Sequence, residues 1–135
     1  MVPHARLLHT MLRVRDLDAS LDFYVGKLSM RLLRRRDFPE GQFTLAFVGY
    51  GHESETAVVE LTHNWGEQDY TLGTAFGHIA IGVDDVFAAI RGLDQQGVKV
   101  VRPAGPLKGD ESETIAFIED PDGYRIELIE RSLGA

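Results

Sequence analysis

Hydrophobic and polar positions alternate with a period of two in two short stretches of the chain. In residues 8–14, one side is apolar apart from a threonine, and the opposite side carries His9 and Arg13. Residues 78–83 repeat this pattern, again with a histidine, His78, on the less apolar side. Strict alternation predicts a half-buried strand. We therefore expect two strands, each with an aliphatic face and a histidine face.

A helical pattern follows each of these strands. The first apolar stripe has the spacing i, i+3, i+4, i+7 and consists of Leu21, Tyr24, Val25 and Leu28. The second has the same spacing and consists of Val86, Ala89, Ile90 and Leu93. Asp18 or a neighbour is placed to cap the first helix, Asp84 or Asp85 to cap the second, and Gly97 suits the C-terminal end of the second. The aliphatic strand faces and the helix stripes can pack together, which leaves the histidine faces to line a cavity.

Three more strands are expected after each helix, so that each half has the order βαβββ. They lie near 30–36, 43–48 and 57–63 in the first half, and near 98–102, 114–119 and 124–130 in the second. Asp120-Pro-Asp-Gly123 is a strong turn signal before the last strand. The fold class is therefore α+β, with two tandem βαβββ modules that form a curved sheet around a site.

The modules are expected to form one domain over residues 1–135. The first module covers about 6–63, the linker about 64–77 and the second module about 78–131. A chain of 135 residues can bury a sizeable core as one domain.

Composition excludes several classes of function. The chain has no cysteine, which removes disulfides, thiolate metal sites and a cysteine nucleophile. A formal charge of −7 argues against nucleic-acid binding as the main activity. No apolar run approaches the roughly 20 residues of a membrane span. The first residues lack an apolar signal core, so the sequence predicts a cytoplasmic protein with no membrane contact.

The repeated layout places one histidine and one glutamate in each module. His9 opens the first module and Glu60 lies in its closing strand; His78 and Glu127 take the same places in the second. A single strand histidine is more often structural, and a strand glutamate is usually solvated. Because both modules repeat the pair on corresponding faces, the joint pattern predicts a pseudo-symmetric metal site of two histidines and two glutamates.

Imidazoles and carboxylates suit a divalent transition metal such as Ni, Co, Mn, Fe or Zn. A structural zinc site would more often use cysteines and be closed. Four such ligands leave two positions of an octahedral shell for a chelating substrate with two neighbouring oxygens. The metal can then act as a Lewis acid while an adjacent carboxylate moves protons.

Several motifs, in order, resemble the glyoxalase I family of the vicinal oxygen chelate superfamily, over about residues 6–131. The matching segments are Leu8-His-Thr-Met-Leu-Arg-Val14, Leu45-Ala-Phe-Val-Gly-Tyr-Gly51, Glu60-Leu-Thr-His-Asn-Trp-Gly66, Gly77-His-Ile-Ala80 and Asp120-Pro-Asp-Gly-Tyr-Arg-Ile-Glu-Leu128. The resemblance implies metal-dependent isomerisation of the glutathione–methylglyoxal hemithioacetal to S-lactoylglutathione through an enediolate. This reaction detoxifies methylglyoxal.

The resemblance also implies roles for individual residues. The metal ligands are His9, Glu60, His78 and Glu127; Glu127 is the proton-transferring base, and Glu60 is its counterpart. The glutathione contacts are Arg13, Asn64 and Lys108. Each of these contacts has a simpler alternative, as a surface cation, a turn asparagine and a solvated loop lysine respectively. Lys108 opens an expected flexible loop that continues to Thr114 and is acidic from Asp110 to Glu113.

The short chain resembles the compact bacterial form of the family, which implies Ni²⁺, with Co²⁺ as a second possibility and Zn²⁺ less favoured. The resemblance further implies a homodimer in which the first module of one chain faces the second module of the other. His9 and Glu60 would then come from one subunit, and His78 and Glu127 from its partner.

Two other classes of function remain open from the sequence. The first class is another enzyme of the superfamily: an epimerase, an extradiol dioxygenase or a thiol transferase acting on an antibiotic. The second glutamate argues against a dioxygenase, which normally uses two histidines and one carboxylate. The other class is a metal-free binding protein on the same fold, against which the four intact ligand positions argue.

Overall fold

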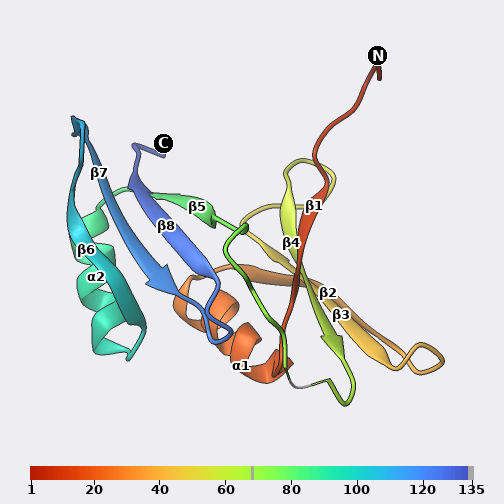
Figure 1. The fold of residues 1–135 in the computed structure, drawn as a ribbon. Helices are drawn as coiled ribbons and strands as arrows, with labels where there is room; N and C mark the ends of the chain where they lie inside the picture. The colour runs from red at the N-terminus through yellow and green to blue at the C-terminus, as the bar shows by residue number, and fades with distance from the viewer. Residues whose placement is uncertain (68, 134–135) are drawn as a thin grey trace. The chain divides into compact units, whose positions relative to one another are not determined.

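The computed structural model describes residues 1–67 and 69–133, and the chain forms two compact units, Met1–Tyr70 and Thr71–Ala135. Each unit has the expected βαβββ order and contains one four-stranded sheet (Figure 1). The α+β fold class with two modules is confirmed. Within the described residues, no helix is long and apolar enough to span a membrane.

The first unit contains a sheet with the strand order β1-β4-β3-β2. Its elements are β1 (His9–Arg13), α1 (Leu17–Leu21), the π-helix η1 (Asp22–Lys27), β2 (Arg31–Phe38), β3 (Phe43–Gly49) and β4 (Val58–Asn64). β1 pairs with β4 in parallel, and the other pairs are antiparallel. The parallel pairing places the first strand of the module beside the last.

The second unit has the corresponding order β5-β8-β7-β6. Its elements are β5 (His78–Val83), α2 (Val86–Gln95), β6 (Lys99–Leu107), β7 (Asp110–Glu119) and β8 (Arg125–Glu130). β5 pairs with β8 in parallel, and β7 pairs antiparallel with both β6 and β8. The same topology therefore brings the histidine strand beside the glutamate strand in both units.

The core of each unit lies where the aliphatic strand face meets the helix. Leu12 and Val14 at the end of the first strand are buried, whereas His9 and Arg13 are exposed. In α2, Val86 and Leu93 are buried as predicted, and Asp85 caps the helix by accepting a hydrogen bond from the Ala88 amide at 3.0 Å. Gly97 ends this helix with φ = 82°, a left-handed conformation that favours glycine.

The first helix differs from the expected regular stripe. Asp16, not Asp18, caps it by accepting from the Ala19 amide. After five α-helical residues the chain widens into the π-helix, where the Leu28 amide donates to the Phe23 carbonyl. The side chains that become buried are Leu17, Ser20, Phe23, Tyr24 and Leu28. Of the expected stripe, Tyr24 and Leu28 are therefore buried, whereas Leu21 and Val25 are only partly buried.

The expectation of a flexible loop over residues 108–114 is wrong. β6 runs to Leu107 and β7 begins at Asp110, so only Lys108 and Gly109 form the turn of a long hairpin. Gly109 has φ = 97°, which a tight turn of this kind favours. The sequence predicted β6 only to residue 102, because proline normally interrupts a strand ladder and two prolines follow. In the structure the strand continues through them, and the β6–β7 register shifts where they lie.

Candidate metal site

Strand register places His9 and Glu60 together in the first unit. Glu60 lies opposite Met11 on β1 and opposite Phe47 on β3, and His9 is two residues before Met11 on the same strand face. The His9 Nε2 atom is 2.6 Å from the Glu60 Oε2 atom. The glutamate side chain is 14% exposed and the histidine side chain 37% exposed. The histidine of this pair is thus accessible to solvent, whereas the glutamate is mostly covered.

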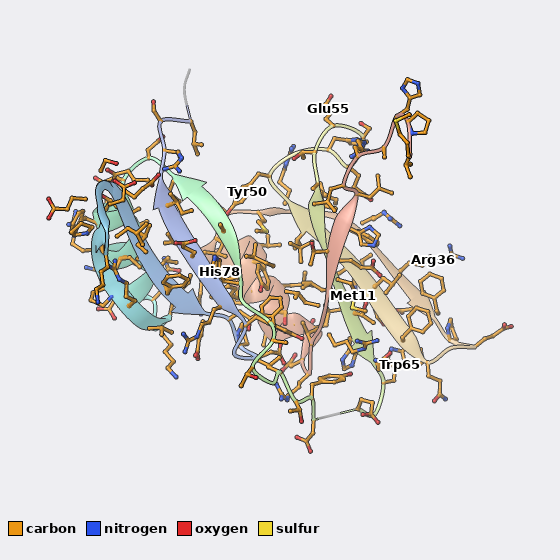
Figure 2. All side chains as sticks on the ribbon, turned by 45° about the horizontal axis from the view of Figure 1, so that its top comes forward. Met11, Arg36, Tyr50, Glu55, Trp65 and His78 are labelled. Atoms are coloured by element: carbon orange, nitrogen blue, oxygen red, sulfur yellow. The ribbon has the colours of Figure 1, made fainter. Side chains whose placement is uncertain are left out.

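The second unit repeats this arrangement. Glu127 on β8 lies opposite Ala80 on β5 and opposite Phe117 on β7. The His78 Nε2 atom is 3.0 Å from the Glu127 Oε1 atom, with side-chain exposures of 41% and 13%. Figure 2 shows the His78 side chain on β5. The predicted duplication therefore extends from sequence spacing to the contact of the side chains.

Each histidine ring also packs against a phenylalanine that the sequence analysis did not single out. The edge of one ring meets the face of the other for His9 and Phe47, at 5.5 Å and 84°, and for His78 and Phe117, at 5.2 Å and 79°. Phe47 and Phe117 lie within the strands expected near 43–48 and 114–119, in an Ala-Phe dipeptide that both modules contain. Each phenylalanine lies opposite a glutamate across the strand pair, so the shared dipeptide identifies it only in combination with the strand register.

The donor atoms of each pair are spaced as neighbouring ligands of one ion are. Bonds of about 2.1 Å to nitrogen and oxygen put adjacent ligands of an octahedral ion about 3 Å apart. The measured separations are 2.6 and 3.0 Å. Neutral imidazole and carboxylate also form a donor set that divalent transition metals accept. Within residues 1–67 and 69–133 no group of three or more His, Asp or Glu side chains is placed to hold a metal ion, so each unit presents one histidine–glutamate pair, called a half-site below.

Two of the three expected glutathione contacts lie on the face that carries Glu60. Arg13 is paired with Thr62, two residues beyond Glu60 on β4, and Asn64 is two residues further along the same strand. The Asn64 amide nitrogen donates to the Tyr70 hydroxyl at 3.3 Å. Lys108 belongs to the other unit, in the hairpin turn between β6 and β7. All three assignments remain predictions.

A charged group stands beside the first half-site. The Arg34 guanidinium lies 3.7 Å from the centre of the Phe47 ring and makes two hydrogen bonds to Glu53, at 2.8 and 3.1 Å. The hydrogen bond from Arg34 holds the pKa of the Glu53 carboxyl below its usual value, and the same bond raises the pKa of Arg34. Arg34 thus covers the ring that supports His9, with its charge balanced by Glu53.

Comparison with known proteins identifies relatives over nearly the whole chain. Residues 6–128 match the family described as the Glyoxalase/Bleomycin resistance protein/Dioxygenase superfamily. A probable lactoylglutathione lyase of Synechocystis is 60% identical, covering 93% of this chain and 95% of that protein. The lactoylglutathione lyase of Neisseria meningitidis serogroup A is 59% identical, covering 96% and 93%.

Comparison with solved structures also identifies relatives over most of the chain. The crystal structure of glyoxalase I from Zea mays superposes with a TM-score of 0.90 at 46% identity. The match covers 93% of this chain and 44% of the maize chain, so this chain spans less than half of that protein. A trypanothione-dependent glyoxalase I of Leishmania major superposes with a TM-score of 0.84 at 46% identity, covering 93% of this chain and 86% of that chain.

Proposed function

The chain belongs to the glyoxalase/bleomycin resistance protein/dioxygenase superfamily, and on this premise we propose that it is a lactoylglutathione lyase. It converts the glutathione–methylglyoxal hemithioacetal to S-lactoylglutathione and so removes methylglyoxal. Identity of 59–60% to lactoylglutathione lyases over more than nine-tenths of the chain supports this activity. The observation that carries the proposal is the pair of matching half-sites, each with one histidine 2.6 or 3.0 Å from one glutamate.

The proposed metal ligands are His9, Glu60, His78 and Glu127. A divalent metal held by these residues supplies Lewis-acid stabilisation of the negative charge that develops on two neighbouring substrate oxygens. The phenylalanine rings at 5.5 and 5.2 Å fix the orientation of the two imidazoles, so that Nε2 faces the carboxylate in each pair. Fixed orientation lowers the reorganisation that metal binding requires.

The proton-transfer role falls to a glutamate. Isomerisation removes the proton from C1 of the hemithioacetal and adds a proton to C2, through an enediolate. Glu127 is the proposed base, and Glu60 is its counterpart in the other module. Both carboxylates are mostly shielded by their sheets, at 13% and 14% exposure, which keeps bulk water from competing for the proton.

Glutathione binding is assigned to Arg13, Asn64 and Lys108. The guanidinium of Arg13 can hold a carboxylate through paired hydrogen bonds, and the Asn64 amide can both donate to and accept from a peptide-like ligand. Lys108 supplies a cation at the tip of the β6–β7 hairpin. Strand register supports the first two, because both lie on the face of β1 and β4 that carries Glu60.

We further propose Ni²⁺ as the working metal and a homodimer as the working assembly. Two nitrogen and two oxygen donors leave two positions of an octahedral shell, which suits Ni²⁺ better than Zn²⁺, since zinc accepts four ligands readily. Because each module holds only half of the ligand set, a complete site needs two modules that face each other. In the proposed dimer they come from different chains. A single domain over 1–135 and a cytoplasmic location remain predictions.

The experiment is a spectrophotometric assay with methylglyoxal and glutathione on metal-stripped protein and on the same protein after reconstitution. The proposal expects formation of S-lactoylglutathione only after metal is returned. A metal-free binding protein of the same fold would show neither turnover nor stoichiometric metal uptake. Failure of reconstituted protein to isomerise the adduct, with metal bound, would refute the proposed function.

A further inference from the structure

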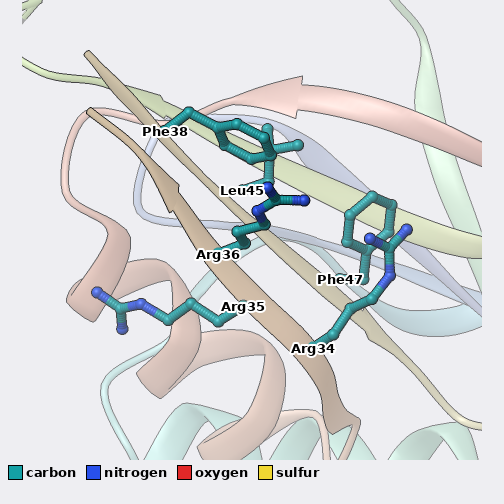
Figure 3. A pocket seen from close by; sticks show the side chains of 6 residues that line it. All are labelled: Arg34, Arg35, Arg36, Phe38, Leu45 and Phe47. Atoms are coloured by element: carbon teal, nitrogen blue, oxygen red, sulfur yellow. The ribbon is translucent and has the colours of Figure 1, made fainter. Parts of the chain in front are cut away.

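A hollow of about 240 Å³ lies over β2 and β3 of the first unit, next to the first half-site. It is lined by residues Arg34, Arg35, Arg36, Phe38, Leu45 and Phe47, of which Arg35 directs its side chain away from the hollow (Figure 3). Phe47 belongs to both places, because its ring also meets the edge of the His9 imidazole. A group attached to a substrate held at His9 and Glu60 therefore has this hollow as its neighbour.

The three consecutive arginines of β2 differ in how their charges are balanced. Arg34 is paired with Glu53 through two hydrogen bonds. Arg35 points to the opposite side of the strand, where Asp18 lies 3.9 Å away (Figure 3). Arg36 has no carboxylate partner within residues 1–67 and 69–133; its guanidinium lies over the Phe38 ring, 4.7 Å from the ring centre. Its charge is thus available to a ligand.

Stacking on Phe38 prepares Arg36 to bind an anion. The guanidinium lies over the ring, which restricts the side chain and leaves N–H groups to donate. The Phe38 ring itself stacks on Phe43, with ring centres 4.7 Å apart and planes 15° apart, so Phe43 holds the ring that contacts Arg36. A cation held in this way loses little side-chain entropy when a carboxylate arrives.

Strand register sets the distance between Arg36 and Arg13, one of the expected glutathione contacts. Arg36 lies opposite Leu45, Leu45 opposite Thr62, and Thr62 opposite Arg13, so the two arginines end one row across the sheet. Three strand spacings separate them by about 14 Å. If Arg13 on β1 takes a carboxylate of glutathione, the part of the substrate that comes from the aldehyde extends towards β3 and β2.

We propose that Arg36 binds a carboxylate carried by the aldehyde-derived part of the substrate. The site then accepts 2-oxoaldehydes that bear a terminal carboxylate, in addition to neutral ones. Leu45 and Phe47 contact the methylene groups of such a substrate, and Arg36 binds its charged end. This inference rests on the proposed function, which it deepens by naming a class of substrate.

The test measures binding of two unreactive thioethers of similar size by titration calorimetry. S-(3-carboxypropyl)glutathione carries the additional carboxylate, and S-butylglutathione is its neutral counterpart. Arg36→Gln is expected to raise the Kd of the carboxylate thioether about tenfold, the lower end for a hydrogen bond to a charged group at an exposed position. The Kd of the butyl thioether should change by less than about twofold. Arg36→Lys should recover much of the loss.

Arg35→Gln is the matched control, because it removes the same charge from the neighbouring position on the opposite strand face. It should leave the ratio of the two Kd values unchanged. The inference is overturned by an unchanged ratio in Arg36→Gln, by an equal loss for both thioethers, by an equal effect of Arg35→Gln, or by failure of both thioethers to bind. Turnover of the methylglyoxal adduct is measured separately. Turnover with an unchanged ratio removes this inference alone, whereas absence of turnover removes the proposed function.

Discussion

The turn between β7 and β8 provides a prediction whose magnitude follows from the structure. Asp120 is 5% exposed, and its Oδ1 atom accepts hydrogen bonds from the Asp122 and Tyr124 amides, each at 2.9 Å. Replacing Asp120 with alanine leaves two buried N–H groups without this acceptor. Each hydrogen bond to a charged group contributes roughly 1.5–3 kcal/mol. We expect Asp120→Ala to lower the free energy of unfolding by about 3 kcal/mol, the sum of two such contributions at the lower end of this range.

The free energy of unfolding is measured on metal-free protein by urea unfolding monitored by circular dichroism. Two further variants serve as controls. Asp120→Asn keeps the Oδ1 acceptor and should lose only about 1 kcal/mol. Asp110→Ala removes a similar local contact, in which Oδ1 accepts from the Ser112 amide at 3.1 Å and from its hydroxyl at 2.5 Å, but at an exposed position. Water replaces that acceptor, so the loss should be much smaller. Equal losses for Asp120→Ala and Asp110→Ala would show that burial is not the cause.

Three more predictions concern the base, the metal and the core. Metal-loaded Glu127→Gln should fold but lose roughly 10²–10⁴-fold in kcat, the usual contribution of a general base; substantial turnover would rule out its role. Ni²⁺ should give full activity in reconstitution, Co²⁺ good activity and Zn²⁺ little; equal or better turnover with Zn²⁺ would contradict the octahedral site. Leu61→Ala, at a fully buried position of β4, should cost about 2–5 kcal/mol in urea unfolding, against less than about 0.5 kcal/mol for Leu8→Ala at 57% exposure; similar costs would argue against the described core.

The sequence predicted those parts of the fold that local periodicity controls. The alternation around His78 and the apolar stripe of α2 match the structure, because each is set by one face packing on one core. Around His9 the alternation matches at Leu12 and Val14, whereas Leu8 and Thr10 are exposed. The π-helix after Leu21 was missed, since a change of helix type depends on how Phe23 and Tyr24 pack, which no fixed period reports. The strands expected near 98–102 and 114–119 are shorter than β6 and β7, because Pro103 and Pro106 are atypical of a paired strand.

The histidine–glutamate pairs were predicted from duplication, and their contacts follow from parallel pairing of the first and last strands of each module. The positions of the Phe47 and Phe117 rings beside the histidines depend on cross-strand register, which cannot be deduced from the sequence until the strand pairing is known. Among the described residues, Arg34 and Arg35 each have a carboxylate partner and Arg36 has none, and these partners are distant in sequence. Long-range pairing of this kind cannot be read from spacing.

The central claim is that two half-sites join to form each metal site, and subunit mixing tests it most directly. Glu60→Gln and Glu127→Gln homodimers are each expected to be inactive. They are unfolded and refolded together in equal amounts and loaded with Ni²⁺. If sites are shared between subunits, one site of each mixed dimer collects both substitutions, and the other receives an unmodified Glu60 and an unmodified Glu127.

The measurement is the specific activity of the refolded mixture with methylglyoxal and glutathione. Random pairing makes about half of the dimers mixed, each with one complete site, so activity should return to about a quarter of that of the unmodified protein refolded in parallel. Formation of mixed dimers is verified with one variant carrying a purification tag. Mixed dimers that form, bind metal and remain as inactive as the two parent homodimers would contradict the shared site.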